Sequence, residues 1–183
     1  MVQSTPKYSW PVPELDDPPD GPGQLRDLGV AIEGTLEQSQ IVTWVPTWTS
    51  SGSPKPANPA SLTGRYSLSQ GWCDFGFTLT LGSSSTGGIG GWQFILPVAA
   101  NSALSEQVFY GFLFEPQVAR FPLSGVVAGG SRTMRPFAPR GGDMRFAELR
   151  QSDGGANSYI PGNAPGPVQS GGRVTFTGRY LTA

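Results

Sequence analysis

Residues 72–82, WCDFGFTLTLG, decide the fold. Apolar side chains alternate there with small or polar ones, at Cys73, Phe75, Phe77, Leu79 and Leu81. A period of two is typical of a β-strand that has one buried and one exposed face. A Ser/Thr/Gly turn follows, and then a second strand-like run, GWQFILP, at residues 91–97. We therefore predict that the two runs form a β-hairpin with a long loop.

Other short apolar runs predict further strands, at residues 41–49, 107–114, 121–128, 144–149 and 173–181. The 107–114 run is apolar on both faces, which predicts a central strand. Stretches rich in glycine, proline and serine separate the runs, beginning with the loop SSGSPKPANP at 50–59. Six or more strands without helices between them predict a mainly β domain over 41–183. An antiparallel β-sandwich of jelly-roll-like order fits this pattern best.

The tetrapeptide Thr-Gly-Arg-Tyr occurs twice, at 63–66 and at 177–180. We interpret the two copies as strands that fill equivalent places in the fold, with chance as the alternative. In this interpretation the glycine permits a close approach and the tyrosine packs inward. A ligand motif is the less favoured explanation.

The N-terminal segment, residues 1–40, has a different character from the rest. Six prolines in residues 1–23 predict an extended arm, because proline lacks a backbone donor and restricts the residue before it. Four apolar residues would anchor this arm along another surface: Tyr8, Trp10, Val12 and Leu15. An arm with such anchors predicts a partner, so we assign 1–40 to attachment and oligomerisation.

A short helix is predicted from Pro22 to about Gln38. Apolar residues spaced by three or four positions share one face of it, at Leu25, Leu28, Ile32 and Leu36. Proline is tolerated in a first turn, but Gly29 and Gly34 each cost about 1 kcal/mol relative to alanine. The helix should not persist alone. Its stripe either packs on the chain's own β domain or pairs with copies of itself as a short coiled coil of three or more helices.

The composition argues against catalysis. Histidine is absent, which removes the commonest general base and the commonest metal ligand. The single cysteine, Cys73, cannot form an internal disulfide, and we expect it to be a buried apolar residue. The acids of the β domain are scattered and suggest no facing pair for glycoside hydrolysis: Asp74, Glu106, Glu115, Asp143, Glu148 and Asp153. We expect no enzyme activity, no catalytic residue, no cofactor and no metal.

Charge is unevenly distributed. Residues 1–37 hold seven acidic residues against two basic ones, whereas the remainder holds ten basic against six acidic. This asymmetry predicts an interaction arm more than a nucleic-acid binder. Asp16, Asp17 and Asp20 fit no known calcium-loop spacing, so we interpret them as solvated arm charges.

Five arginines cluster in a turn-rich region, at Arg132, Arg135, Arg140, Arg145 and Arg150. A solvated loop is one interpretation of this cluster. Pairing with the acidic arm of a neighbouring subunit is the other, because arginine suits planar pairing with carboxylates. Contact with DNA or an anionic glycan is the least favoured.

No stretch approaches the roughly 20 apolar residues that a bilayer span requires. The opening, MVQSTPKYSW, lacks the charged and then apolar pattern of a secretory signal. We therefore expect a protein that is made in a cytoplasm and stays soluble, without a membrane partner.

Three stretches carry a resemblance to a known group of proteins. They are the run YSWPVPELDDPPDGPGQLRDLGVAIEGTLE at 8–37, the block from Thr47 to Val98, and the closing VTFTGRYLTA. Together they resemble tail-fibre and other minor structural proteins of phages that infect actinobacteria, and they cover about half of the chain. The resemblance implies a virion component present in several copies, as a homotrimer. Its N-terminal portion would attach to other virion proteins, and its β domain would be displayed.

The chain lacks the long coiled or repetitive shaft of a tail fibre, which favours a compact tail-tip, baseplate or capsid-surface protein. A minor tail or baseplate component is the leading hypothesis, and a capsid decoration or head-fibre protein is the nearest alternative. A host-glycan-binding module is a third, with Tyr159 and Trp72 as candidate contact aromatics against the interpretation that their rings complete the core. A depolymerising enzyme is the last.

Overall fold

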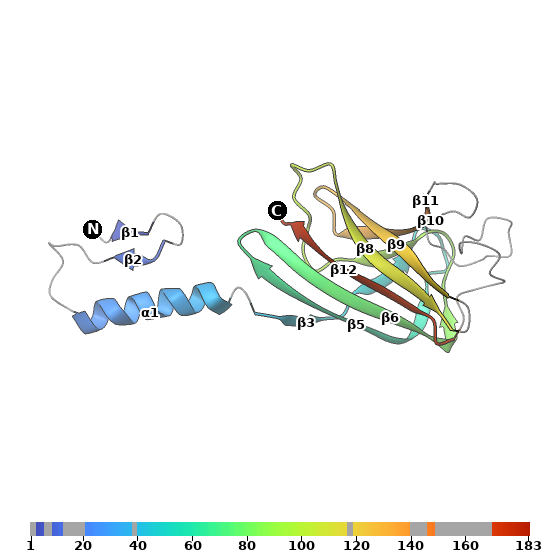
Figure 1. Cartoon of the computed structure of the whole chain (residues 1–183), viewed down its shortest axis with the longest axis horizontal. Helices are drawn as coiled ribbons and strands as arrows, with labels where there is room; N and C mark the ends of the chain where they lie inside the picture. Colours follow the sequence, from blue (N-terminus) through green and yellow to red (C-terminus); the bar gives the residue numbers. More distant parts are fainter. Residues whose placement is uncertain are drawn as a thin grey trace.

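The computed structural model describes residues 3–5, 9–12, 21–37, 40–116, 119–139, 146–148 and 170–183 (Figure 1). Two short strands and one helix come first: β1 (Gln3–Ser4), β2 (Pro11–Val12) and α1 (Gly21–Glu37). The strands that follow are β3 (Val42–Trp44), β4 (Thr47–Ser50), β5 (Ala57–Ser69), β6 (Trp72–Thr86), β7 (Trp92–Ile95), β8 (Glu106–Glu115), β9 (Ala119–Ala128), β10 (Thr133–Pro139), β11 (Phe146–Glu148) and β12 (Arg173–Leu181).

Strands β3 to β12 form one ten-stranded antiparallel sheet. Its order is β3-β5-β6-β12-β8-β9-β10-β7-β4, with β11 paired to β10. The C-terminal strand β12 lies between β6 and β8, so the end of the chain forms the middle of the sheet. The predicted mainly β, antiparallel fold with one preceding helix is confirmed, and the jelly-roll order stays a prediction.

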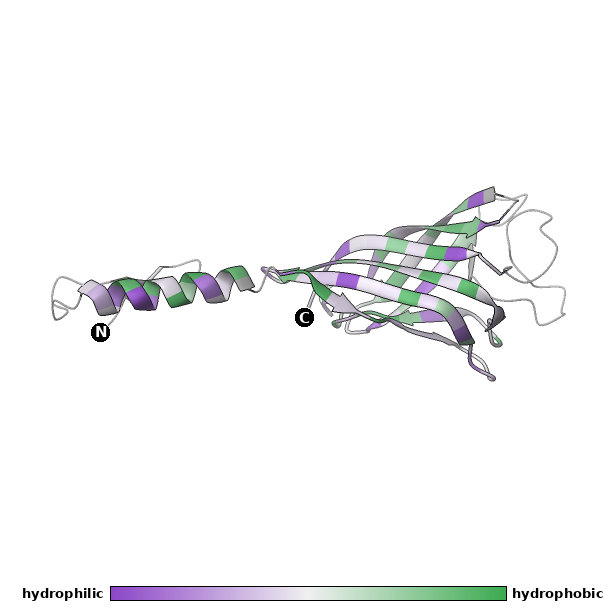
Figure 2. Ribbon diagram, turned by 90° about the horizontal axis from the view of Figure 1, so that it is seen from below, coloured by the Kyte–Doolittle hydropathy of each residue, from purple (hydrophilic) through white to green (hydrophobic). Residues whose placement is uncertain are grey.

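The sheet curls so that its inner face packs on itself, as in a sandwich. Phe77 of β6 and Phe94 of β7 are not on neighbouring strands, yet their ring centroids lie 4.8 Å apart. Phe176 of β12 lies 5.7 Å from Phe77 and 6.5 Å from Phe94. Hydropathy alternates along the long strands (Figure 2), and the five apolar residues predicted from residues 72–82 are all buried. The opening sequence pattern therefore locates the core.

The predicted hairpin between residues 72–82 and 91–97 is wrong. Strand β6 continues to Thr86 and pairs with β5 and β12, whereas β7 pairs with β4 and β10. The turn between β6 and β7 carries the chain across to the other side of the curl, where the Trp92 indole donates to the Gly87 carbonyl at 2.8 Å. Pattern alone could not distinguish an adjacent strand from one that faces it across the core.

Two further strand boundaries differ from the prediction. The 41–49 run is split into β3 and β4, with Val45 and Pro46 between them. Strand β10 lies in a region interpreted as turns, because its two prolines hide the alternation of its buried positions Met134, Pro136 and Ala138.

Strand β8 is flanked by β12 and β9, as expected for the central 107–114 run. Only one of its two apolar faces is buried, however. Val108, Tyr110 and Phe112 point outward and are 56%, 75% and 58% exposed. The outward face of this strand is therefore an apolar surface without cover from the described chain.

The two Thr-Gly-Arg-Tyr copies lie in β5 and β12, on opposite sides of β6. Tyr180 is buried and Tyr66 packs against the core from the other side. At both glycines an added Cβ would lie 2.7 Å from an aromatic side chain, that of Trp44 at Gly64 and that of Phe109 at Gly178. The registers of the two copies against β6 differ by two residues, since Gly64 pairs with Phe77 and Gly178 with Phe75. In both copies the glycine permits a close approach and the tyrosine packs inward, as the sequence predicted.

Replacing Gly178 with alanine is expected to cost about 1–3 kcal/mol of unfolding free energy, because Phe109 is buried among other rings and cannot retreat. Urea denaturation measures the loss. Gly76→Ala is the matched control, since its nearest neighbour would be the Phe176 carbonyl oxygen at 3.7 Å. Equal stabilities for the two variants would contradict this packing.

The N-terminal elements lie to one side of the sheet (Figure 1). Strands β1 and β2 form a small antiparallel pair, and α1 packs against β2. The Trp10 indole donates to the Thr35 hydroxyl at 3.0 Å, which fixes the arm to the helix. Leu28 and Ile32 are half-buried, whereas Leu25 is 71% exposed and Leu36 is also exposed. The apolar stripe of α1 is therefore partly covered at Leu28 and Ile32 and exposed at Leu25 and Leu36.

Candidate functional site

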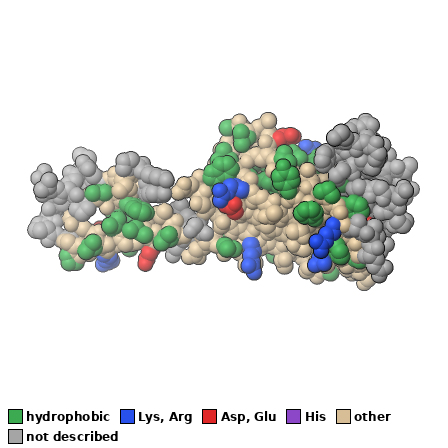
Figure 3. Space-filling model, viewed as in Figure 1, with side chains coloured by type: hydrophobic (Ala, Val, Ile, Leu, Met, Phe, Trp, Pro, Cys, Tyr) green, Lys and Arg blue, Asp and Glu red, His purple; other side chains and the backbone are tan. Residues whose placement is uncertain are grey.

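The outer face of the sheet consists of the outward side chains of β5, β6, β12, β8 and β9. Cross-strand register aligns them in rows. One row is formed by Thr63, Thr78, Thr175, Phe112 and Pro122. The next is formed by Arg65, Gly76, Thr177, Tyr110 and Ser124. The first row passes from threonines to apolar residues, and the second places Tyr110 between Thr177 and Ser124. Figure 3 shows hydrophobic side chains among basic ones on this face.

The polar half of the outer face is held by two interactions between β6 and β12. The hydroxyls of Thr78 and Thr175 lie 3.1 Å apart. Arg179 donates from two nitrogens to the two oxygens of Asp74, each at 2.8 Å. Hydrogen bonding to Arg179 lowers the pKa of Asp74, and the pKa of Arg179 is raised in turn. This pair is largely exposed and screened by solvent, so it contributes little to stability.

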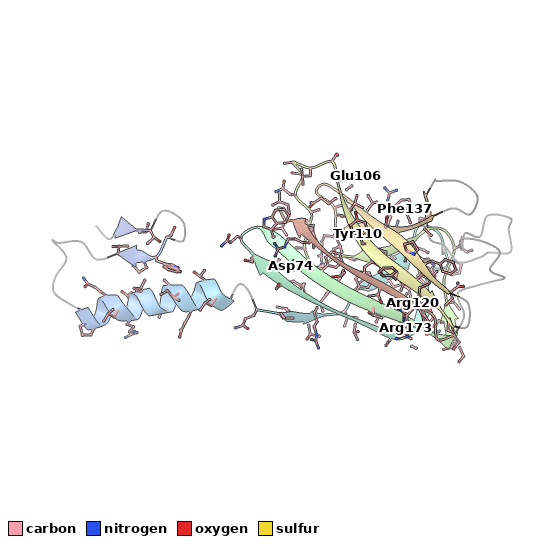
Figure 4. The ribbon with its side chains drawn as sticks, in the orientation of Figure 1. Asp74, Glu106, Tyr110, Arg120, Phe137 and Arg173 are labelled. Atoms are coloured by element: carbon pink, nitrogen blue, oxygen red, sulfur yellow. The ribbon has the colours of Figure 1, made fainter. Side chains whose placement is uncertain are left out.

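Phe114 continues the apolar half toward one end of the sheet. Register places Arg173 of β12 and Arg120 of β9 directly opposite it on either side. Both guanidinium groups lie over its ring, at 4.9 Å for Arg173 and 5.8 Å for Arg120. Figure 4 shows these two arginines close together, with Asp74 toward the other end of the sheet. Stacking on the ring orients both charges at the surface.

A pocket of about 360 Å³ opens beside this ring. We call it the Phe114 pocket, and it is lined by Thr78, Phe112, Phe114, Arg120, Arg173 and Thr175. A larger open depression of about 570 Å³ shares Thr78 and Thr175 with it and extends over β6 toward Arg65. The Phe114 pocket combines two cations, two hydroxyls and two aromatic rings without an acidic lining residue.

Sequence reasoning missed the Phe114 pocket. A hairpin register between residues 114 and 120 would have placed Arg120 beside the ring. Arg173 could not have been placed, because β12 is inserted between β6 and β8 from a distant part of the sequence.

The buried polar groups of the inner face have structural roles. The Tyr180 hydroxyl donates to the Val98 carbonyl at 3.0 Å, and burial is the main cause that raises its pKa. Cys73 is fully buried, as expected, and burial raises the pKa of its thiol. A protonated thiol without solvent access is a poor nucleophile.

Glu115 is the one buried carboxylate among the described residues. It ends β8, is 4% exposed, and its Oε1 has no hydrogen-bond partner within the described chain. Burial raises the pKa of its carboxyl group. The folded chain therefore keeps this proton at pH values where the unfolded chain has lost it. Stability falls as pH rises from the ordinary glutamate range through the raised value.

We expect Glu115→Gln to remove this decline. The unfolding free energy of the variant relative to wild type should increase between pH 4 and pH 7, as measured by urea denaturation at several pH values. Asp74→Asn is the control, because the pKa of Asp74 is lowered and its contribution to stability is lost only as pH falls below the ordinary aspartate range, so this variant should show no comparable change between pH 4 and pH 7. A pH-independent difference between Glu115→Gln and wild type would contradict the assignment.

Other predicted residues are placed as follows. Arg132 donates to the Leu96 carbonyl at 2.9 Å, and Arg135 lies over the Phe137 ring at 5.8 Å. Trp72 is partly exposed at the start of β6. Several candidates lie outside the described residues: Tyr8, Leu15, Asp16, Asp17, Asp20, Arg140, Arg145, Arg150 and Tyr159.

The described acids of the β domain do not converge. Asp74 is paired on the outer face, whereas Glu106 and Glu115 lie at opposite ends of β8 and Glu115 is buried. Asp143 and Asp153 lie outside the described residues, and Glu148 is described only through its backbone. Among residues that the structure describes, no group of three or more acids and cysteines is placed to hold a metal ion. Within the same residues, no helix has the length and apolar character needed to cross a membrane.

Comparisons with protein-family models, with curated proteins and with solved structures gave no match for this chain.

Proposed function

We propose that this chain is a non-enzymatic structural subunit of a phage virion, a minor tail or baseplate component. Its N-terminal arm and helix assemble with copies of the chain and with other virion proteins, and its β domain is displayed. The sequence resemblance supplies the setting, and a trimer is the assembly that it implies.

The exposed stripe of α1 is the observation that carries the proposal. The helix packs against β2 and stands beside the sheet, leaving Leu25 exposed next to half-buried Ile32. A 17-residue helix with two glycines is marginal in water, so further burial of its apolar stripe would stabilise it. Pairing with the same stripe of other copies supplies that burial.

Sedimentation equilibrium of the full chain tests the assembly. The expected molar mass is three times the 19.3 kDa of one chain. A mass equal to one chain across the micromolar range would contradict self-assembly in solution.

A further inference from the structure

We propose that the Phe114 pocket binds a carboxylated sugar, a uronic acid unit of a polysaccharide. The inference deepens the proposed function, because it assigns a ligand class to the β domain that the virion would display.

The charge of the pocket selects an anion. Arg120 and Arg173 each stack on Phe114, and within the described chain neither forms an ion pair. Both side chains are exposed, and no acidic side chain lines the pocket. A guanidinium group presents parallel donors that match the two oxygens of a carboxylate, so a planar carboxylate suits this pair.

The remaining lining suits a sugar ring. The hydroxyls of Thr78 and Thr175 can exchange hydrogen bonds with sugar hydroxyls, and the Phe112 ring presents an apolar wall. Tyr110 lies next along β8 and is more exposed than any other large apolar side chain of the described chain, at 75%. Aromatic rings with one solvent-exposed face pack well against the C–H face of a pyranose. A volume of about 360 Å³ is at the lower end of small-ligand pockets, as expected for one sugar unit.

The surroundings of the pocket favour a polymer. The depression of about 570 Å³ continues from Thr78 and Thr175 across β6, so neighbouring units could extend along the outer face. A second copy of this chain is a poorer occupant. A two-fold contact between two such faces would set arginine against arginine, and interface centres are depleted of charge.

Calorimetric titration of the full chain with a galacturonic acid hexamer tests the inference. Arg173→Gln is expected to weaken binding about tenfold or more, because it removes a charge-assisted bidentate contact. Arg26→Gln is the control: it removes the same charge from an exposed position on α1, away from the pocket and the adjoining depression, and should weaken binding less than about twofold. Arg173→Lys keeps the positive charge but loses the parallel donors of the guanidinium group, and it should bind with intermediate affinity. A neutral galactose hexamer should bind at least about tenfold more weakly than the acid.

Three results would overturn the inference. They are the absence of binding of the acidic hexamer to wild type, an equal loss in Arg26→Gln and Arg173→Gln, and binding of a phosphorylated sugar without binding of the uronate. Thermal melts of each variant establish that it folds. A monomeric helix variant, Leu25→Asp/Ile32→Asp, should bind the hexamer with unchanged affinity per chain. If the chain proves to be a monomer, the binding test of the Phe114 pocket therefore remains valid.

Discussion

Replacing Phe176 with alanine is expected to lower the unfolding free energy by about 3–5 kcal/mol, the largest effect of any substitution considered. Phe176 is fully buried and packs against Phe77 and Phe94, the rings that join the two sides of the curled sheet. Truncation of the side chain removes its apolar contacts and leaves a cavity, because strands β6 and β7 hold Phe77 and Phe94 in place. The midpoint of guanidinium denaturation measures the effect.

Phe112→Ala is the matched control for this substitution. Phe112 is on the neighbouring strand, but it points outward and is 58% exposed. Its truncation should cost less than about 1 kcal/mol. Similar losses in the two variants would mean that the outer face of β8 is buried in the protein as it exists in solution.

The second large effect is expected from Leu25→Asp/Ile32→Asp, which should convert the proposed trimer to a monomer. The two substitutions place charges two turns apart on the apolar stripe of α1, at exposed Leu25 and half-buried Ile32, where an interface between helices would bury them without partners. Light scattering at matched concentration measures the change as a threefold fall in molar mass.

Val30→Asp provides the control for the helix. Val30 is on the same helix and is exposed, but it lies on another side, five residues from Leu25 at 100° per residue. It should leave the mass unchanged. If Val30→Asp dissociates the assembly as fully as the double variant, a general loss of helix stability is the cause and the stripe is not the interface.

Local patterns predicted individual strands well but their partners poorly. The alternation in residues 72–82 identified a half-buried strand, and the 173–181 run matches β12 residue for residue. The partner assigned to residues 91–97 was wrong, because the sheet curls and the neighbours of β7 come from residues 47–50 and 133–139. Strand pairing depends on which surfaces meet after the sheet curls, and a period of two contains no such information.

The candidate site was less predictable than the fold. The apolar character of residues 107–114 was visible in the sequence, but it suggested a core strand because an exposed apolar face normally costs solubility. The arginines singled out from composition lie near one another in sequence, whereas Arg120 and Arg173 meet only across β8. Exposed aromatic residues between separated arginines become recognisable as a site only when the register is known.

Mass spectrometry of purified particles tests the central claim most directly. The proposed function implies that a phage encodes this chain, and its particles would be separated on a density gradient into complete virions and tailless heads. A minor tail or baseplate subunit should appear in complete virions at a fixed ratio to the other tail proteins and be absent from tailless heads. Presence in tailless heads at the same ratio would instead indicate a capsid decoration or head-fibre protein. Absence from both fractions, with the chain abundant in the infected-cell lysate, would contradict a structural role in the virion.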